Sequence, residues 1–190
     1  MHWQYAPIVW IYLASAIIAG GMAIYAWRQR SVAGSAAFAV MQSGAALWAA
    51  GYAVLISRSD LSSILFFANV SWTGAALEAP ACLVMALQFA NRTQLSRRAL
   101  LGHAFMPALT LAVVWTSYYH NLIRYSVYLK KYGSLTILER TQGLWYWIYF
   151  YYSYVLIAII VFTLLRSAWR ETRGRRIQPL ILMIGLLVSG

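Results

Sequence analysis

Glu78 is the residue of this sequence best placed to do chemistry, because it is the only acidic residue inside any of the long apolar runs. A charged carboxylate in the middle of a membrane costs about 2.5 kcal/mol or more, so Glu78 should be paired, protonated or turned toward water. Pro80 follows two residues later and removes the backbone hydrogen bond to the Ala76 carbonyl. Together they predict a polar patch and a kink in mid-span.

The neighbours of Glu78 favour close packing of a second helix. The residues three or four positions away are all small, namely Gly74, Ala75, Ala81 and Cys82. Three residues of later runs come level with it when counted inward from the outer side: Ser153, Tyr154 and Thr110. Gln42 and His103 fall nearer the cytoplasmic ends. We expect Glu78 at a contact with the run that begins at Leu144, either as a ligand-responsive group or as a neutral group that only joins helices.

Aromatic residues indicate a second feature near the outer surface. Residues 145–154 contain eight of them, more than an interfacial belt requires. Besides belt and packing roles, the outer-half rings of four runs predict a pocket for an apolar or aromatic ligand. The residues predicted to bind it are Glu78, Trp72, Trp115, Trp147, Tyr151 and Tyr154. Glu78 would form the floor of a cavity rimmed by Trp72, Trp115 and Trp147.

Other chemistries find little support. His103 and His120 flank one helix about 25 Å apart, so they cannot share a metal ion. Lys130 and Lys131 both lie in a loop, which excludes a retinal Schiff base within these residues. With no phosphate-binding glycine loop and no nucleophile beside a base, we expect no cofactor, no metal and no catalytic residue.

The elements that carry these residues are membrane spans. The chain is 62% hydrophobic and 10% charged, with a mean hydropathy of +0.63. Its net charge of +11 comes from arginines between apolar runs, which indicates contact with lipid headgroups rather than nucleic acid. Cys82, the single cysteine, cannot form an intramolecular disulfide. The N-terminus lacks the basic region of a signal peptide, so the first span should remain as an anchor.

Five complete spans are predicted, at residues 7–27, 36–56, 64–90, 100–116 and 144–165. Gly44 and Gly51 offer points of close approach in the second. A sixth apolar run begins at Ile177 and reaches Gly190 after fourteen residues, whereas a span needs about 20. We therefore expect an all-α polytopic bundle with a partial sixth span, residues 1–190 being a membrane-embedded fragment without its output domain.

The distribution of cations predicts the orientation. Ten of the fifteen arginines and lysines lie in the connections after the first, third and fifth spans. The excess marks these connections as cytoplasmic, so the N-terminus and the long loop should lie outside the cell membrane. In that loop, residues 123–129 alternate in hydrophobicity, 134–140 do so less regularly, and Gly133 lies between them. This pattern predicts a short β-hairpin, placed as a lid over the outer ends of spans four and five, with a disordered loop as the alternative.

Several stretches resemble one family, the N-terminal seven-span sensor domain of bacterial and archaeal histidine kinases. They are Ala46–Ala53 in the second run; Pro107–Thr110 and Val114–Thr116 with His120 and Leu122 in and after the fourth; and Gly143–Trp147 with Tyr152–Tyr154 in the fifth. The match covers about residues 28–190. It implies a membrane input module followed by a cytoplasmic output domain, such as a dimeric kinase. Glu78 replaces an expected apolar residue and Tyr149 an expected histidine, so the resemblance implies no role for Glu78.

The leading interpretation is a sensory domain for an extracellular or membrane-borne ligand, which relays its signal to that output domain within a homodimer. The alternative is a small secondary transporter, with Glu78 and Pro80 forming a coupling site on a broken helix. No second interrupted helix pairs with this one as an inverted repeat. A membrane-embedded enzyme would need more acid–base groups than the spans contain.

Overall fold

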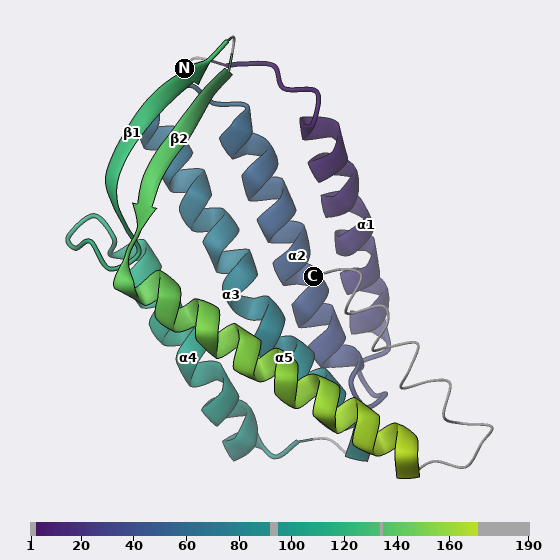
Figure 1. Cartoon of the computed structure of the whole chain (residues 1–190). Helices are drawn as coiled ribbons and strands as arrows, with labels where there is room; N and C mark the ends of the chain where they lie inside the picture. Colours follow the sequence, from purple (N-terminus) through teal and green to yellow (C-terminus); the bar gives the residue numbers. More distant parts are fainter. Residues whose placement is uncertain (1–2, 92–94, 134, 171–190) are drawn as a thin grey trace.

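The computed structural model describes residues 3–91, 95–133 and 135–170. In chain order the described elements are α1 (Val9–Arg28), α2 (Ser35–Ile56), α3 (Leu61–Asn91), α4 (Arg97–Trp115), β1 (Arg124–Tyr132), β2 (Leu135–Gln142) and α5 (Leu144–Arg170) (Figure 1). All five helices are long and apolar enough to cross a membrane, as the five complete apolar runs predicted. The expected sixth run lies outside the described residues.

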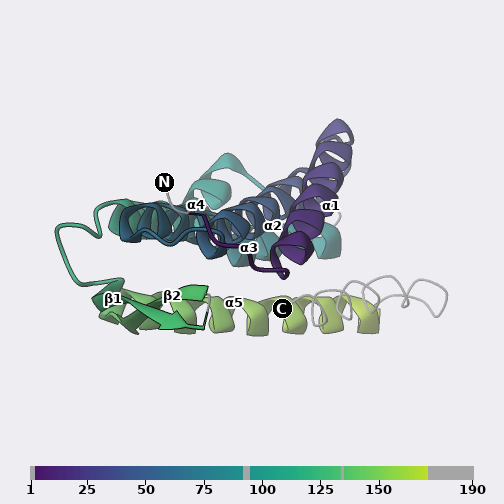
Figure 2. The same cartoon turned by 90° about the horizontal axis from the view of Figure 1, so that it is seen from above.

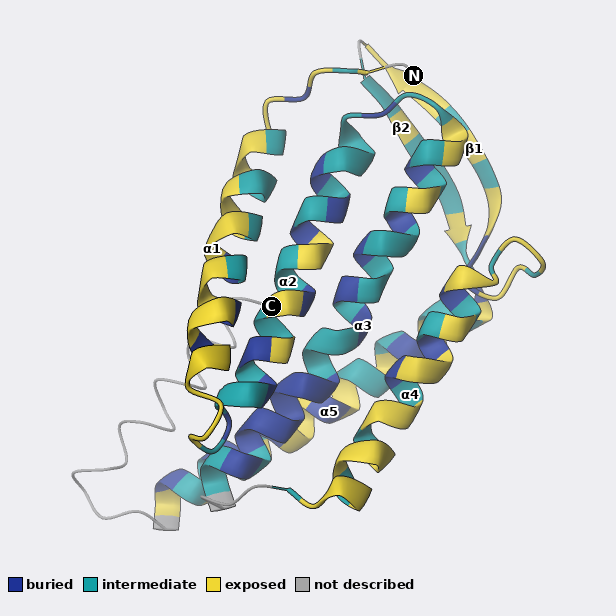
Figure 3. Cartoon of the chain, turned by 180° about the vertical axis from the view of Figure 1, so that it is seen from behind, coloured by how far each residue is buried: buried dark blue, intermediate teal, exposed yellow. Residues whose placement is uncertain are grey.

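The helices lie in two layers. Seen from above, α1 to α4 form one layer, and α5 lies on its own side with the hairpin near its N-terminal end (Figure 2). α3 packs against α2, α4 and α5, so it is the central helix. The outward sides of α1 and α4 are exposed and carry apolar residues such as Ile17 and Phe105 (Figure 3). An apolar exterior is what a helix in lipid requires.

Helices α2 and α3 pack with their backbones almost touching. A Cβ added to Gly74 would collide with the carbonyl oxygen of Gly44 and the backbone nitrogen of Trp48. A Cβ on Gly51 would lie 2.7 Å from the Ser71 hydroxyl oxygen. The close approach predicted at Gly44 and Gly51 is therefore confirmed, and small residues set the distance between these two helices.

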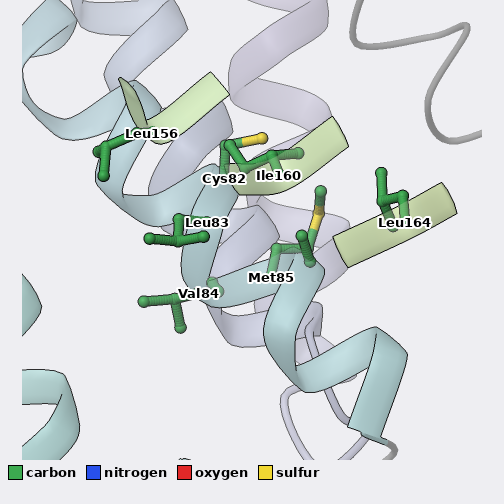
Figure 4. Close-up of a cluster of buried hydrophobic side chains, with 9 residues drawn as sticks. Cys82, Leu83, Val84, Met85, Leu156, Ile160 and Leu164 are labelled. Carbon is green, nitrogen blue, oxygen red and sulfur yellow. The ribbon is translucent and has the colours of Figure 1, made fainter. Parts of the chain in front are cut away.

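The C-terminal half of α3 packs against α5 through a cluster of buried apolar side chains (Figure 4). Its members are Ala37, Cys82, Leu83, Val84, Met85, Ala86, Leu156, Ile160 and Leu164. Cys82 is a free, buried thiol. We call this group the α3–α5 cluster; it fixes the C-terminal halves of the two helices against each other.

Strands β1 and β2 form an antiparallel hairpin that is longer than the alternating segments of the sequence. Gly133, at the turn, has a φ of +63°, a conformation that glycine adopts without strain. Between Tyr125 and Tyr128 the register shifts by a bulge, where Ser126 also has a positive φ.

We predicted that the hairpin lies over the ends of α4 and α5, but it instead runs along the N-terminal half of α3 (Figure 1). Arg124 of β1 donates a hydrogen bond to Asn69 of α3. At the other end of the hairpin, the Gln4 side chain pairs with Thr136, accepting from its N–H at 2.7 Å and donating to its carbonyl at 2.9 Å. These polar contacts draw the hairpin toward α3 and the N-terminal segment, which explains the difference.

Candidate functional site

The carbonyl of Ala76 lacks its helical partner because Pro80 has no N–H, as the sequence predicted. Tyr149 of α5 donates its hydroxyl to this oxygen at 2.8 Å, in a buried setting. α3 continues through Pro80 as one helix, so proline has not broken it. A residue from another helix thus satisfies the free acceptor, and we call this hydrogen bond the α3–α5 latch.

A cavity of about 560 Å³ lies beside the latch, between α2, α3 and α5. Glu78 lines it together with Ser153 and Tyr154, the residues of α5 that we expected near Glu78. The Cγ atom of Glu78 also lies 3.4 Å from where a Cβ on Gly44 would be, which places Glu78 at the contact of α2 with α3. Within the described part of the chain, its carboxylate makes no hydrogen bond or ion pair. We call this space the Glu78 cavity.

Only three of the six predicted ligand-binding residues meet in the Glu78 cavity: Trp72, Glu78 and Tyr154. Trp115 instead donates its indole N–H to the Thr73 hydroxyl at 3.1 Å, between α3 and α4. Trp147 and Tyr151 are 45% and 64% exposed. These two are one helical turn apart on α5, on a face beside the one that lines the cavity. The predicted rim of Trp72, Trp115 and Trp147 is therefore not formed.

Two further expectations about the surroundings of Glu78 differ from the structure. Thr110 is buried and accepts a hydrogen bond from the Trp145 indole at 3.3 Å, so it joins α4 to α5 and does not face Glu78. Gln42 does line the Glu78 cavity, although we placed it nearer the cytoplasmic end. The Gly44–Gly74 contact fixes the register of α2 against α3 and brings Gln42 level with Glu78.

Three further rings of α5 line the cavity, namely Tyr146, Tyr149 and Phe150, and none of them is among the six predicted ligand-binding residues. With Ser153 they are spaced three, four and seven residues from the first, which is the signal of one helix face. Trp72 of α3 packs edge-on against Tyr146 and Tyr149, with ring centroids 5.7 and 6.2 Å apart. Trp72 therefore lies directly beside the latch.

A smaller recess of about 170 Å³ lies nearer the hairpin, between α2, α3 and β2. Its lining residues are Trp48, Tyr52, Leu55, Ala68, Ser71, Trp72, Ala75 and Arg140. We call it the outer recess. Trp72 and Ala75 line both spaces, so the outer recess and the Glu78 cavity share a wall.

Comparison with protein families identifies the class of the chain. The model for the N-terminal 7TM region of histidine kinase matches residues 11–189. The chain belongs to this family. No curated protein and no solved structure matches it. As a 7TM region of a histidine kinase, it is a multi-pass membrane protein, in agreement with its five apolar helices.

The family match extends further toward the N-terminus than the resemblance seen in the sequence, which began near residue 28.

The transporter alternative for this 7TM region needs a broken helix with free backbone carbonyls at the coupling site. Instead, α3 is continuous, and the Ala76 carbonyl already accepts a hydrogen bond from Tyr149. The geometry around Pro80 therefore favours a contact between helices over an ion site.

Proposed function

We propose that this 7TM region is the sensory input domain of a histidine kinase, detecting an extracellular or membrane-borne ligand. The observation that carries the proposal is the Glu78 carboxylate, which borders a cavity beside the α3–α5 latch. An acidic residue inside a membrane is costly to maintain, which favours a functional role. Membership in a family named for histidine kinases supports the same class.

In the proposed mechanism, the ligand contacts Trp72, Glu78 and Tyr154, the predicted residues that share the cavity. Either a contact with Glu78 or a change in its protonation shifts the packing of α3 against α5. A ligand that fits one packing better than the other shifts the balance between the two. The shift is relayed to a cytoplasmic kinase or other output domain of the full-length protein, which acts as a homodimer.

We propose that the N-terminus lies outside the cell membrane. The excess of arginines in the odd-numbered connections supports this orientation. Gln4 contacts the hairpin, which supports placing the N-terminal segment on the same side as that loop. A ligand from outside would then meet the hairpin before the Glu78 cavity.

The test is Glu78→Gln in the full-length protein, which keeps the shape of the side chain and removes its titration. We expect insertion to be unchanged and basal autophosphorylation, measured in membranes across a pH series, to change severalfold and lose its pH dependence. Glu139→Gln is the matched control, because Glu139 lies on the hairpin, where its carboxylate contacts Lys130 and Tyr132. If Glu78→Gln and Glu78→Leu both behave like the parent, the proposed role of Glu78 is wrong.

A further inference from the structure

The outer recess combines aromatic walls with one charged group. Trp48 and Tyr52 of α2 stack on each other with ring centroids 5.8 Å apart, and both line the recess. Trp72 of α3 and Arg140 of β2 also line the recess. Apolar walls with a single well-placed polar group are typical of sites for small molecules.

Arg140 has a second arginine beside it. Arg124 pairs with Gln142 across the hairpin, and Arg140 precedes Gln142 by two residues, so both arginines project from one face of the hairpin. Arg124 is 6% exposed and donates through Nη2 to Asn69 and Ser117, while its buried Nη1 has no hydrogen-bond partner among the described residues. A buried guanidinium nitrogen without an acceptor is unfavourable, so an acceptor is expected here.

No carboxylate of the described chain neutralises this pair. Glu139, next to Arg140 in sequence, is on the opposite face of β2, where it contacts Lys130 at 4.0 Å and the Tyr132 hydroxyl at 2.9 Å. Burial, and second the charge of Arg140, lower the pKa of Arg124 to about 10, which leaves it charged at neutral pH. Two cations therefore lie close together on the helix-facing side of the hairpin.

We propose that the outer recess binds a small organic anion. Its carboxylate lies against Arg140, with Arg124 behind it as a second positive charge, and its flat apolar body contacts the rings of Trp48, Tyr52 and Trp72. A guanidinium matches the two oxygens of a carboxylate. The volume is below the range of about 300 Å³ or more usual for larger ligands, which favours a compact acid.

This proposal deepens the proposed sensory function. The binding of an anion does not depend on that function, but the role of the bound anion in signalling rests on it. Trp72 and Ala75 separate the outer recess from the Glu78 cavity. An anion in the recess would press on Trp72, which contacts Tyr149 of the latch. Occupancy of the recess would thereby reach the α3–α5 contact without the anion touching Glu78.

The test uses the full-length protein in phosphatidylcholine nanodiscs with phenylacetate, and with phenylacetamide as a neutral probe of the same shape. We expect phenylacetate to raise the thermal unfolding midpoint in a saturable manner and phenylacetamide to leave it unchanged. Arg140→Gln should weaken phenylacetate binding roughly tenfold or more, the loss typical of a charged hydrogen-bond partner. Lys130→Gln, the same change of charge on the opposite face of the hairpin, where Lys130 contacts Glu139, should bind like the parent.

Asn69→Asp provides a second variant, because it places a carboxylate against Arg124 within the fold. We expect it to raise the midpoint without any probe and to reduce the response to phenylacetate.

Equal responses to the acid and the amide, full binding by Arg140→Gln, or no response to phenylacetate would each overturn the proposal. A response only to inorganic phosphate, or only to added phosphatidylglycerol, would overturn the organic acid in favour of a phosphate or a lipid headgroup. This experiment measures binding and not kinase output. A negative result would therefore overturn the anion site without deciding the Glu78 test of sensory function.

Discussion

Proline inside a membrane helix leaves a carbonyl that must find a donor, because lipid offers none. In this chain the donor is the hydroxyl of Tyr149, and the acceptor is Ala76, four residues before Pro80. The same hydrogen bond that repairs α3 also holds α5 in place. Tyr149 therefore stabilises the structure, and a shift in the packing of α3 against α5 would alter its hydrogen bond.

Tyr149→Phe tests this hydrogen bond. Removing the hydroxyl leaves the Ala76 carbonyl without a partner, so we expect the free energy of unfolding to fall by about 1 kcal/mol, as for other hydrogen bonds within membranes. In a Pro80→Ala background the helix supplies its own N–H, and the loss should shrink toward zero. The measurement is a double-mutant cycle of unfolding in mixed micelles. Tyr151→Phe is the control, since Tyr151 is exposed, and an equal loss in both backgrounds would contradict the latch.

Part of this site could be predicted from the residue types alone. The position of Pro80 identifies Ala76 as the free acceptor, and the apolar surroundings of Glu78 identify it as unusual. The donor could not be predicted, because Tyr149 is one of eight aromatic residues in ten and only the crossing of α3 and α5 selects it. The same crossing turns Trp147 and Tyr151 away from the cavity.

At the scale of elements, the pairing of α2 with α3 depends on glycine. Gly74→Ala would drive a methyl group into backbone atoms of Gly44 and Trp48, which cannot move aside as a flexible side chain would. We expect a loss of about 2 kcal/mol from this overpacking. Gly20→Ala in α1 is the control, because nothing lies within 4 Å of the added carbon. Thermal unfolding in detergent compares them, and similar midpoints would show that the helices are not in close contact.

Near its turn, the hairpin is attached to the rest of the molecule through a glutamine of the N-terminal segment. Gln4 donates to the carbonyls of Ile56 and Thr136 and accepts from the Thr136 amide. Gln4→Ala removes all three hydrogen bonds, so hydrogen exchange of the Thr136 amide should become roughly tenfold faster or more. Gln29→Ala should have no such effect, because the hydrogen bond that its side chain donates goes to Tyr25 of α1. Unchanged exchange in Gln4→Ala would mean that other contacts hold the hairpin.

The existence of these elements was predictable and their packing was not. Apolar runs of sufficient length predicted five spans, and alternation around Gly133 predicted the hairpin. The bulge at Ser126 and the attachment through Gln4 depend on contacts between residues far apart in the sequence. The local pattern of hydrophobicity cannot predict such contacts. For this reason the hairpin was expected over α4 and α5.

At the scale of the whole molecule, the proposed topology has a direct test. Single cysteines at Lys131 and Gln29, in a Cys82→Ser background, are exposed to a membrane-impermeant maleimide on intact cells. Arginine asymmetry predicts that position 131 reacts at once and position 29 only after permeabilisation. Both residues are exposed, so access to the side chain is not limiting. Labelling in the reverse order would show that the N-terminus is inside.

The separation of α5 from the layer of α1 to α4 has a consequence for biosynthesis. Helices leave the ribosome in chain order, so α1 to α4 can assemble while α5 is still being made. Until α5 arrives, the Ala76 carbonyl and the Glu78 carboxylate have no partner helix on that side of α3. The newly made protein must therefore hold an unfinished polar face within the membrane, and the arrival of Tyr149 is the step that completes it.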